Sequence, residues 1–442
     1  MELEAQKTKG LFRRNSKTLF SLAMGYFVDQ GEGQAMSVLS PILQQVWGLS
    51  LANIGLIGTI RSLLQALSAP FWGYASDKLS RKKVIVFGTG IWGIWTAVCG
   101  LTQNFSQLLL VRAISGLGLG CLMPATFSLM SDIFPPKKRG KALGILEGIG
   151  VLGIVIGVLA LGQVATPELW RWGFIILGLM SMLSGLIIWI FVKEPVRGAA
   201  EPELMGKINA ENAKQFSVKF EDIFKVLSIP TVWVAILQGL AGSMPWVVMG
   251  LYFINWMVTV REMEIGNATI AFAIIVIGIA ASNIIGGILG DFAEEKNPKY
   301  GRVIVGQVSI VAGIPMSWVM LTMTDNWPLW AFIVWCLLTA LLISWPGKGA
   351  KEPMMQGAVP PELRSTAFAM TTFIESGFAA LVAWFAGRLA DNIGFTNALI
   401  WTIPVPWIIC AALFSLFYWA YPRDSRILRQ QMAERADQLE TE

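Results

Sequence analysis

Two carboxylates lie one helical turn apart within the first long apolar run of the chain. Asp29 and Glu32 are three residues apart, with Gln34 close by, so in a helix both carboxylates lie on one face. A charged side chain at the centre of a bilayer costs about 2.5 to 3.5 kcal/mol on insertion scales, which makes each one a functional candidate. A carboxylate in a partly dry cavity holds its proton more readily than one in water. The pair is therefore predicted either to carry a proton or to form structural ion pairs, with Arg112 as the partner of Asp29.

Further ionisable side chains are expected at membrane depth. Arg61 lies in the middle of the second apolar run and is predicted either to pair with Glu32 or to meet an anionic substrate. Arg112 of the fourth run is predicted to be structural. Glu147 and Glu375 occupy similar depths in the fifth and eleventh runs. A gating contact and a proton relay both remain open for these two carboxylates.

The tenth run contains the segment Trp345-Pro346-Gly347-Lys348-Gly349-Ala350-Lys351-Glu352-Pro353. Prolines and glycines at this density break or kink a helix. Irregular backbone at membrane depth is tolerated only where it is buried in protein or lines a cavity. Lys348 and Glu352 are four residues apart and are predicted to neutralise each other, which leaves Lys351 as an unpaired cation facing a polar cavity. The alternative is that the run ends near Trp345 and that these charges lie in a loop.

The chain around these residues is strongly apolar. Of 442 residues, 55% are hydrophobic and 14% are charged, against about 25% charged residues in soluble domains. Apolar runs near the ~20 residues that span a bilayer recur along the chain. The polar N-terminal stretch has no features of a cleaved signal peptide. The sequence therefore predicts an all-α integral membrane protein.

Several classes of chemistry are excluded by composition. The chain has no histidine, which removes His-ligated metal sites and His-activated nucleophiles. The 4 cysteines, each within an apolar run, are predicted to be buried thiols. No phosphate-binding Gly-rich loop is present, and no nucleophile lies beside a base. Neither a cofactor, a metal nor an enzymatic activity is expected, and the net charge of +5 indicates no nucleic-acid partner because the basic residues cluster at helix ends.

Twelve membrane-spanning helices are predicted. They lie near residues 18–42, 51–75, 84–103, 107–133, 141–164, 171–192, 230–258, 266–291, 302–323, 328–356, 365–390 and 396–421. The predicted organisation is an N-terminal tail at 1–17, a six-helix bundle at 18–192, a linker at 193–229, a second six-helix bundle at 230–421 and a C-terminal tail at 422–442. With both termini in the cytoplasm, only Arg171 and Arg261 lie outside, as the excess of cytoplasmic Lys and Arg requires. The expected location is the plasma (cell inner) membrane.

The two halves resemble each other. The segment 287–291 after the eighth span is a degenerate copy of 73–77 after the second, and 360–364 matches 135–139. Matches at corresponding positions indicate a duplicated six-helix unit, as in transporters with internal repeats. The same alignment places 348–352 inside the tenth span, which favours the cavity over the loop.

The segment between the second and third spans reads Gly73-Tyr-Ala-Ser-Asp77-Lys78-Leu-Ser80-Arg81-Lys82-Lys83. Its clustered cations predict a water-facing cytoplasmic loop. It resembles the cytoplasmic motif of the major facilitator superfamily, although Ser80 stands where that family usually has Gly. Residues 112–120 resemble that family's fourth-helix motif. The glycines of the fifth span have the spacing of its antiporter motif, although Val158 replaces the usual Pro after Gly157.

The first half also resembles Spinster-like lipid transporters of the same superfamily. The matching pieces are 27–29, 101–110 and 130–136. Gln30 stands where that group usually has Arg, and Leu119 stands where it has an acidic residue. Both substitutions remove groups that those transporters use for proton coupling.

The superfamily resemblance implies two pseudo-symmetric six-helix bundles that rock around a central cavity lined chiefly by the first, fourth, seventh and tenth helices. We expect a secondary transporter, monomeric within the lipid bilayer, that couples H+ to the movement of an organic anion such as a carboxylate. The predicted substrate-binding residues are Lys348, Lys351, Arg61, Gln34, Trp246, Tyr252 and Trp256. The predicted proton-coupling residues are Asp29, Glu32, Glu147 and Glu375. The predicted ion-pair and gating residues are Arg112, Glu352, Gly73, Asp77, Lys78, Arg81 and Asp291.

Other functions stay open at this point. A lysophospholipid or drug exporter is the alternative within transporters. A channel would not accumulate its substrate, and a sensor derived from a transporter would bind a ligand and move nothing.

Overall fold

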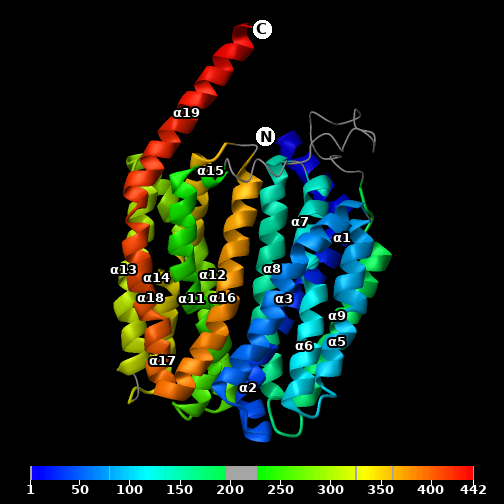
Figure 1. Ribbon diagram of the computed structural model, residues 1–442. Helices are drawn as coiled ribbons and strands as arrows, with labels where there is room; N and C mark the ends of the chain where they lie inside the picture. Colours follow the sequence, from blue (N-terminus) through cyan, green and yellow to red (C-terminus); the bar gives the residue numbers. More distant parts are fainter. Residues whose placement is uncertain are drawn as a thin grey trace. The chain divides into compact units, whose positions relative to one another are not determined.

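A computed structural model describes residues 2–78, 80–134, 136–195, 226–323, 326–360 and 363–441. Every regular element in these ranges is a helix (Figure 1). The chain divides into two compact units. Unit 1 comprises Met1–Ser217 with Glu264–Ala273, and unit 2 comprises Val218–Met263 with Ile274–Glu442. Most of the predicted linker at 193–229 lies outside the described residues.

Unit 1 contains the helices of the first six predicted spans. They are α1 (Glu2–Gly33), α2 (Ala35–Trp47), α3 (Leu51–Lys78), α4 (Arg81–Ile85), η1 (Val86–Ile91), α5 (Gly93–Cys99), α6 (Phe105–Leu119), α7 (Leu122–Ile133), α8 (Pro136–Gln163) and α9 (Trp170–Phe191). The first, third and fourth spans are each built from more than one helix. Glycine, which forms helix poorly, lies at or beside each of these breaks, at Gly33, Gly93 and Gly120.

Unit 2 contains the helices of the last six predicted spans. They are α11 (Pro230–Thr259), α12 (Ile265–Lys296, divided between the units at Ala273), α13 (Gly301–Thr322), α14 (Leu329–Ile343), η3 (Pro346–Lys351), α15 (Glu352–Ala358), α16 (Arg364–Ile393), α17 (Phe395–Thr402), α18 (Pro404–Phe414) and α19 (Phe417–Thr441). The predicted C-terminal tail is helical, because α19 continues to Thr441 and extends past the end of unit 2 (Figure 1).

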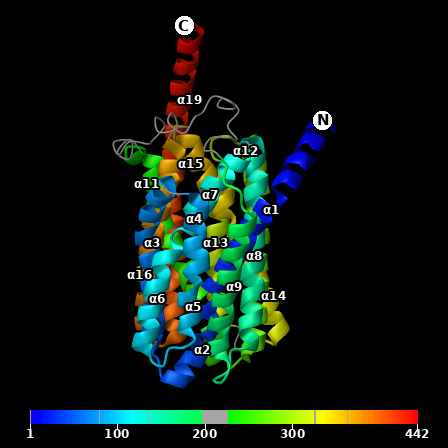
Figure 2. The ribbon, with the colours of Figure 1, turned by 90° about the vertical axis from the view of Figure 1, so that its right-hand side faces the viewer.

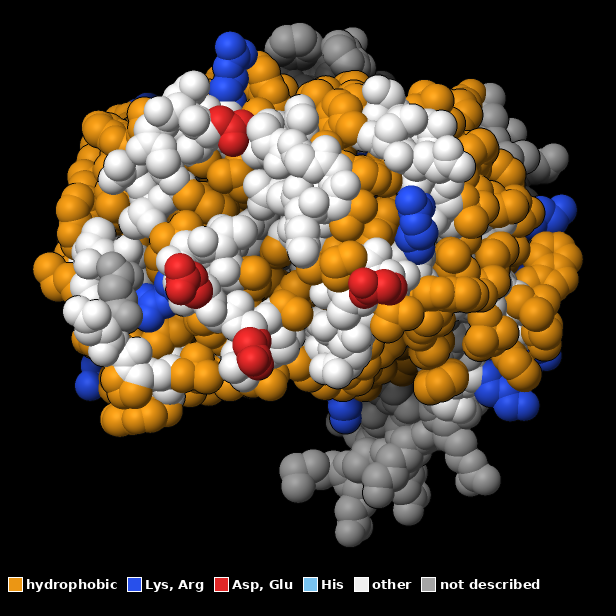
Figure 3. All heavy atoms as spheres, turned by 90° about the horizontal axis from the view of Figure 1, so that it is seen from below, with side chains coloured by type: hydrophobic (Ala, Val, Ile, Leu, Met, Phe, Trp, Pro, Cys, Tyr) orange, Lys and Arg blue, Asp and Glu red, His pale blue; other side chains and the backbone are white. Residues whose placement is uncertain are grey.

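Nine helices in the described residues are long and apolar enough to cross a membrane. The three remaining predicted spans are the first, third and fourth, each of which is interrupted by a break. Phe105–Leu119 of the fourth span is among the shorter apolar helices. Large apolar side chains are exposed on these helices, for example Leu183 at 54%, Ile284 at 67% and Trp330 at 70%. On the face in Figure 3, charged side chains lie singly among apolar and uncharged ones. That view looks onto one end of the helices, whereas the exposed apolar side chains named above lie along the helices and suit lipid rather than water.

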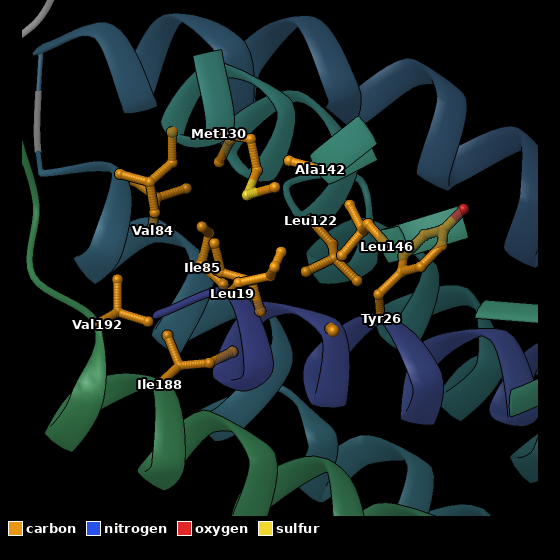
Figure 4. Packing of buried hydrophobic residues seen from close by; sticks show 14 of the residues in the cluster. Leu19, Tyr26, Val84, Ile85, Leu122, Met130, Ala142, Leu146, Ile188 and Val192 are labelled. Carbon is orange, nitrogen blue, oxygen red and sulfur yellow. The ribbon is translucent and has the colours of Figure 1, made fainter. Parts of the chain in front are cut away.

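The core of unit 1 joins five helices. Figure 4 shows Leu19 and Tyr26 of α1 facing Ile85 of α4, Leu122 of α7 and Leu146 of α8, all of them buried. In Figures 1 and 2, α1 lies beside α8 and α9, with which it makes many contacts. All four cysteines are buried and unbridged, as predicted.

Glycines allow α1 and α8 to approach closely. A Cβ atom on Gly157 would lie 2.7 Å from the Cα atom of Gly31, and one on Gly153 would overlap the backbone oxygen of Phe27. The glycine spacing noted in the fifth span therefore serves helix contact within unit 1.

Candidate functional site

Unit 1 holds a buried cluster of charges contributed by three helices. The Glu32 side chain of α1 is 1% exposed, and its Oε1 atom lies 3.5 Å from Nη1 of Arg112 in α6. The same oxygen lies 3.7 Å from Nη2 of Arg61 in α3. One carboxylate thus faces two guanidinium groups, and the predicted pairing of Arg61 with Glu32 is confirmed.

The predicted pairing of Arg112 with Asp29 is wrong, because Arg112 pairs with Glu32 instead. Gly116 explains why both arginines reach Glu32. A Cβ atom on Gly116 would overlap the backbone oxygen of Arg61, so this glycine lets α6 lie directly against α3. Oδ1 of Asp29 is buried without a hydrogen-bond partner among the described residues. The two arginines thus hold Glu32 rather than Asp29.

The other predicted residues of unit 1 lie apart from this ion pair. Glu147 of α8 is exposed, and its Oε2 atom accepts a hydrogen bond of 3.4 Å from the Tyr26 hydroxyl. Gln34 lies at the break between α1 and α2, where its backbone N–H donates to the oxygen of Gly31 at 3.1 Å. The two residues remain predicted members of a site.

Unit 2 contains a polar cavity of about 250 Å³. Residues of α11, α12, α13, η3, α16 and α18 line it, and Lys351 and Glu375 lie in its wall. Nζ of Lys351 donates hydrogen bonds to both carboxylate oxygens of Glu375, at 2.7 and 2.9 Å. Each side chain is 18% exposed. The prediction that Lys351 is unpaired is therefore wrong, because α16 supplies a carboxylate that lies far along the sequence.

The irregular tenth span is confirmed. Pro346–Lys351 forms a π-helix, and α15 continues it to Ala358, so the span does not end near Trp345. The predicted pair of Lys348 with Glu352 is also present, at 3.0 Å. A wide π-helical turn brings Lys348 and Lys351 to the same cavity.

The three aromatic residues predicted as a cavity wall have different positions. Trp246 lines the cavity. The hydroxyl of Tyr252, however, donates to the backbone oxygen of Ala383 at 2.7 Å, and Nε1 of Trp256 donates to Oγ1 of Thr396 at 2.9 Å. Both side chains are fully buried within unit 2 and are absent from the cavity wall. These hydrogen bonds join α11 to α16 and α17 within unit 2.

Sequence reasoning missed several polar or aromatic residues of the cavity, including Ser243, Ser309 and Ser344. Gln238, Asn283, Trp407 and Cys410 line it beside the lysines. Gln238 and Asn283 are amides within apolar helices, and that isolation could have identified them. Trp407 and Cys410 carry no comparable pattern, because any apolar span contains such residues.

We expect Gly239→Ala to separate Lys351 from Glu375. A Cβ atom on Gly239 would overlap Oε1 of Glu375, so the carboxylate must move. Because Glu375 occupies the cation that an entering anion needs, anion binding should tighten about tenfold in this variant, the effect of roughly 1.4 kcal/mol. Gly242→Ala is the matched control one turn along the same helix, where a Cβ atom meets only Sγ of Cys410 at 3.2 Å. Equal binding by the two variants, measured by titration calorimetry, would contradict this role of Gly239.

The loop motif after the second span forms an ion-pair network rather than a solvated cluster. Arg81 is 1% exposed. Its guanidinium contacts Asp132 of α7, and its Nε donates to Glu194 at 3.2 Å. Ser80 caps α4 and also donates to Glu194. The water-facing prediction is therefore wrong for Arg81, since one carboxylate reaches it from α7 and another from the segment that follows α9.

Of the other predicted ion-pair and gating residues in the two loop motifs, the structure describes the side chain of Asp291 only. The side chains of Gly73, Asp77 and Lys78 lie outside the described residues. In unit 2, Asp291 pairs with Arg302, which also contacts Glu294. Unit 2 thus repeats the pattern of an arginine held by two acids.

Acid is expected to weaken the Glu194 network. Burial acts to raise the pKa of Glu194, but hydrogen bonds from Ser80 and Arg81 outweigh it and lower that pKa below its ordinary value of 4.5. The network therefore stabilises the fold fully above pH 4.5, and this contribution is lost as the pH falls through the lower folded pKa. The difference in thermal midpoint between the wild type and Glu194→Gln should narrow from pH 7 towards pH 4. A difference that stays constant with pH would contradict this assignment.

The fold and the buried charges define a multi-pass membrane protein with a polar cavity in one unit. The sequence pattern of the Major Facilitator Superfamily matches residues 19–377. The chain belongs to that family, as its motifs suggested, and it is a transporter and not an enzyme. The predicted architecture of twelve membrane helices in two bundles is that of the family.

Curated relatives cover most of the chain. A probable 4-methylmuconolactone transporter of Cupriavidus pinatubonensis is 23% identical over 87% of this chain and 86% of its own length. A cis,cis-muconate transport protein of Acinetobacter baylyi is 24% identical over 89% of this chain and 92% of its own. Multidrug resistance protein 3 of Bacillus subtilis is 27% identical over 75% of this chain and 70% of its own.

Solved structures share the fold. A bacterial homologue of the human lysosomal transporter Spinster, inward-facing and unoccupied, matches with a TM-score of 0.75 and 22% identity over 94% of this chain and 98% of that one. A D-xylose–proton symporter matches with a TM-score of 0.69 and 13% identity, over 92% of this chain and 98% of that one. At these identities the likeness concerns the fold alone.

Proposed function

We propose that this protein transports an organic carboxylate together with a proton, by alternating access of its two units. The observation that carries the proposal is the Lys351–Glu375 pair in the cavity of unit 2. Its atoms are close enough for a strong charge-assisted hydrogen bond, yet both groups still reach the cavity. A substrate carboxylate that enters the cavity would bind Lys351 in the position that the Glu375 carboxylate now occupies.

The exchange of carboxylates supplies a route to coupling. Lys351 would release Glu375 and bind the substrate carboxylate in its place. Glu375 would then lie partly buried without a cation, where the neutral acid is favoured over the anion. The proton that Glu375 binds would balance the one carboxylate group that Lys351 takes up. Lys348, held by Glu352 at the same wall, would attract a second acidic group of the substrate.

The relatives support this substrate class. Muconate is a dicarboxylate, and two relatives are named as transporters of cis,cis-muconate and of 4-methylmuconolactone. Two lysines in one cavity fit a molecule with two acidic ends. Asp29, Glu32 and Glu147 of unit 1 remain further candidates for proton transfer.

The test is uptake of labelled cis,cis-muconate into proteoliposomes, with and without an inward proton gradient. Accumulation that requires the gradient supports the proposal. Gradient-independent movement of a lysophospholipid or a cationic drug, with no muconate uptake, would overturn it in favour of the exporter that the multidrug relative suggests. Binding of muconate without movement would indicate a sensor.

We further propose the plasma (inner) membrane as the location, a monomeric state and cytoplasmic termini. The distribution of Lys and Arg along the sequence supports this orientation. Labelling of single cysteines placed near residue 424 and in the 165–169 loop of intact cells tests it. Labelling of the first and protection of the second by a membrane-impermeant reagent would contradict it.

A further inference from the structure

A second cavity lies at the end of unit 2 that carries α19. It has a volume of about 450 Å³ and is lined by residues of α12, α13, α15, α16 and α19. It shares no lining residue with the cavity that contains Lys351. In Figure 1, α15 and α19 lie at the same end of unit 2, where α19 extends beyond the other helices.

The wall of this second cavity is basic. It contains the three guanidinium groups of Arg302, Arg364 and Arg429, against the one carboxylate of Glu294. Arg302 is already occupied, because Asp291 and Glu294 both contact it and its Nη1 donates to the backbone oxygen of Gly349 at 3.1 Å. The guanidinium of Arg302 is therefore held in place by these contacts and is not available to bind an anion.

The other two arginines are available. Arg364 begins α16, is exposed, and donates its Nε hydrogen to the backbone oxygen of Val359 at 3.3 Å. Arg429 of α19 is also exposed. In the described part of the chain, no carboxylate forms an ion pair with either. Two arginines from different helices thus converge on one cavity without a compensating acid.

The remaining lining suits a bulky anion. Gln356 is exposed at the cavity and Tyr421 contributes its ring, while Leu428 and Met432 add apolar surface. Guanidinium forks match the oxygens of phosphate in two-point contacts better than ammonium groups do. A net excess of two cations suits a phosphoryl group, which carries up to two negative charges.

We propose that this second cavity binds a phosphoryl-bearing anion through Arg364 and Arg429. The group comes from the headgroup of an anionic phospholipid or from a free phosphate compound. The end of α12 at Lys296 and the start of α13 at Gly301 set this cavity near the level where membrane helices meet the headgroups. A cavity at this level is accessible both to a phospholipid headgroup and to a phosphate compound in the aqueous phase.

The experiment follows thermal unfolding of the full chain in nanodiscs by its own tryptophan fluorescence, so it needs no transported substrate. One arm titrates pyrophosphate into phosphatidylcholine nanodiscs, with NaCl at matched ionic strength as the reference. The other arm replaces part of the phosphatidylcholine by phosphatidylglycerol. A ligand that binds only the folded protein raises the midpoint.

The variants separate the site from general charge effects. Arg364→Gln and Arg429→Gln should each weaken binding about tenfold, as for one charge-assisted hydrogen bond. Arg426→Gln removes an exposed arginine of α19 that does not line the cavity, and its binding should match the wild type. Arg364→Lys/Arg429→Lys should restore part of the affinity and shows that the fold is intact.

The two arms identify the source of the group. If only phosphatidylglycerol raises the thermal midpoint, and the variants of Arg364 and Arg429 reduce that rise, the group is a lipid headgroup. If only pyrophosphate does so, the group belongs to a free phosphate compound. If neither ligand gives a shift that depends on Arg364 and Arg429, or if Arg426→Gln has the same effect, the proposal is overturned.

Discussion

Lys351→Met is expected to reduce muconate affinity and uptake about 100-fold. The Nζ atom of Lys351 makes both of its recorded hydrogen bonds to Glu375, at 2.7 and 2.9 Å, and in the proposed cycle the substrate takes over these contacts. Losing a charge-assisted contact of this kind costs about 3 kcal/mol, or two factors of ten. The variant also leaves Glu375 partly buried without its cation, which opposes the approach of a second carboxylate. Binding calorimetry and proteoliposome uptake measure the two effects separately.

Two variants control the Lys351 result. Lys348→Met removes a lysine from the same cavity wall, but that lysine is 59% exposed and pairs with Glu352, so its effect should be about tenfold or less. Glu375→Gln keeps Lys351 and should still bind muconate, while uptake no longer responds to the proton gradient. An unchanged affinity in Lys351→Met would refute the cavity of unit 2 as the anion site.

The local features of this site could be predicted from the sequence. The irregular backbone of Pro346–Lys351 follows from its prolines and glycines. The Lys348–Glu352 pair follows from a spacing of four residues within a helix. The membrane spans follow from apolar length alone. Each of these depends on residues that are close together along the chain.

The partners of the buried charges could not be predicted in the same way. Lys351 meets a carboxylate 24 residues away, and Arg112 meets one 80 residues away. Which charged residues pair depends on which helices are in contact and on how closely their backbones approach each other. Gly116, which lets α6 lie against α3, and Gly239, which leaves room for Glu375, decide them through the absence of a side chain. A single sequence does not reveal which glycines have this role.

Glu32→Gln is expected to cause the largest loss of stability in unit 1. Glu32 is the carboxylate that faces Arg61 and Arg112, at 3.7 and 3.5 Å, and both Glu32 and Arg112 are 1% exposed. Removing its charge leaves two buried guanidinium groups facing a neutral amide. Breaking a buried pair in this way costs about 3–5 kcal/mol. The thermal midpoint of the purified protein should fall by several degrees, and expression should decrease.

Restoring the balance of charge distinguishes this ion pair from a simple packing effect. Glu32 is the carboxylate that faces both arginines, so Glu32→Gln leaves two guanidinium groups facing a neutral amide, and Arg112→Gln in the same chain removes one of them. The double variant should therefore be more stable than Glu32→Gln alone. Asp29→Asn should change stability little, because Oδ1 of Asp29 has no hydrogen bond to lose among the described residues. If Asp29 carries a proton, however, this variant changes the pH dependence of uptake. A midpoint for Asp29→Asn as low as that of Glu32→Gln would mean that Asp29 and not Glu32 balances the two arginines.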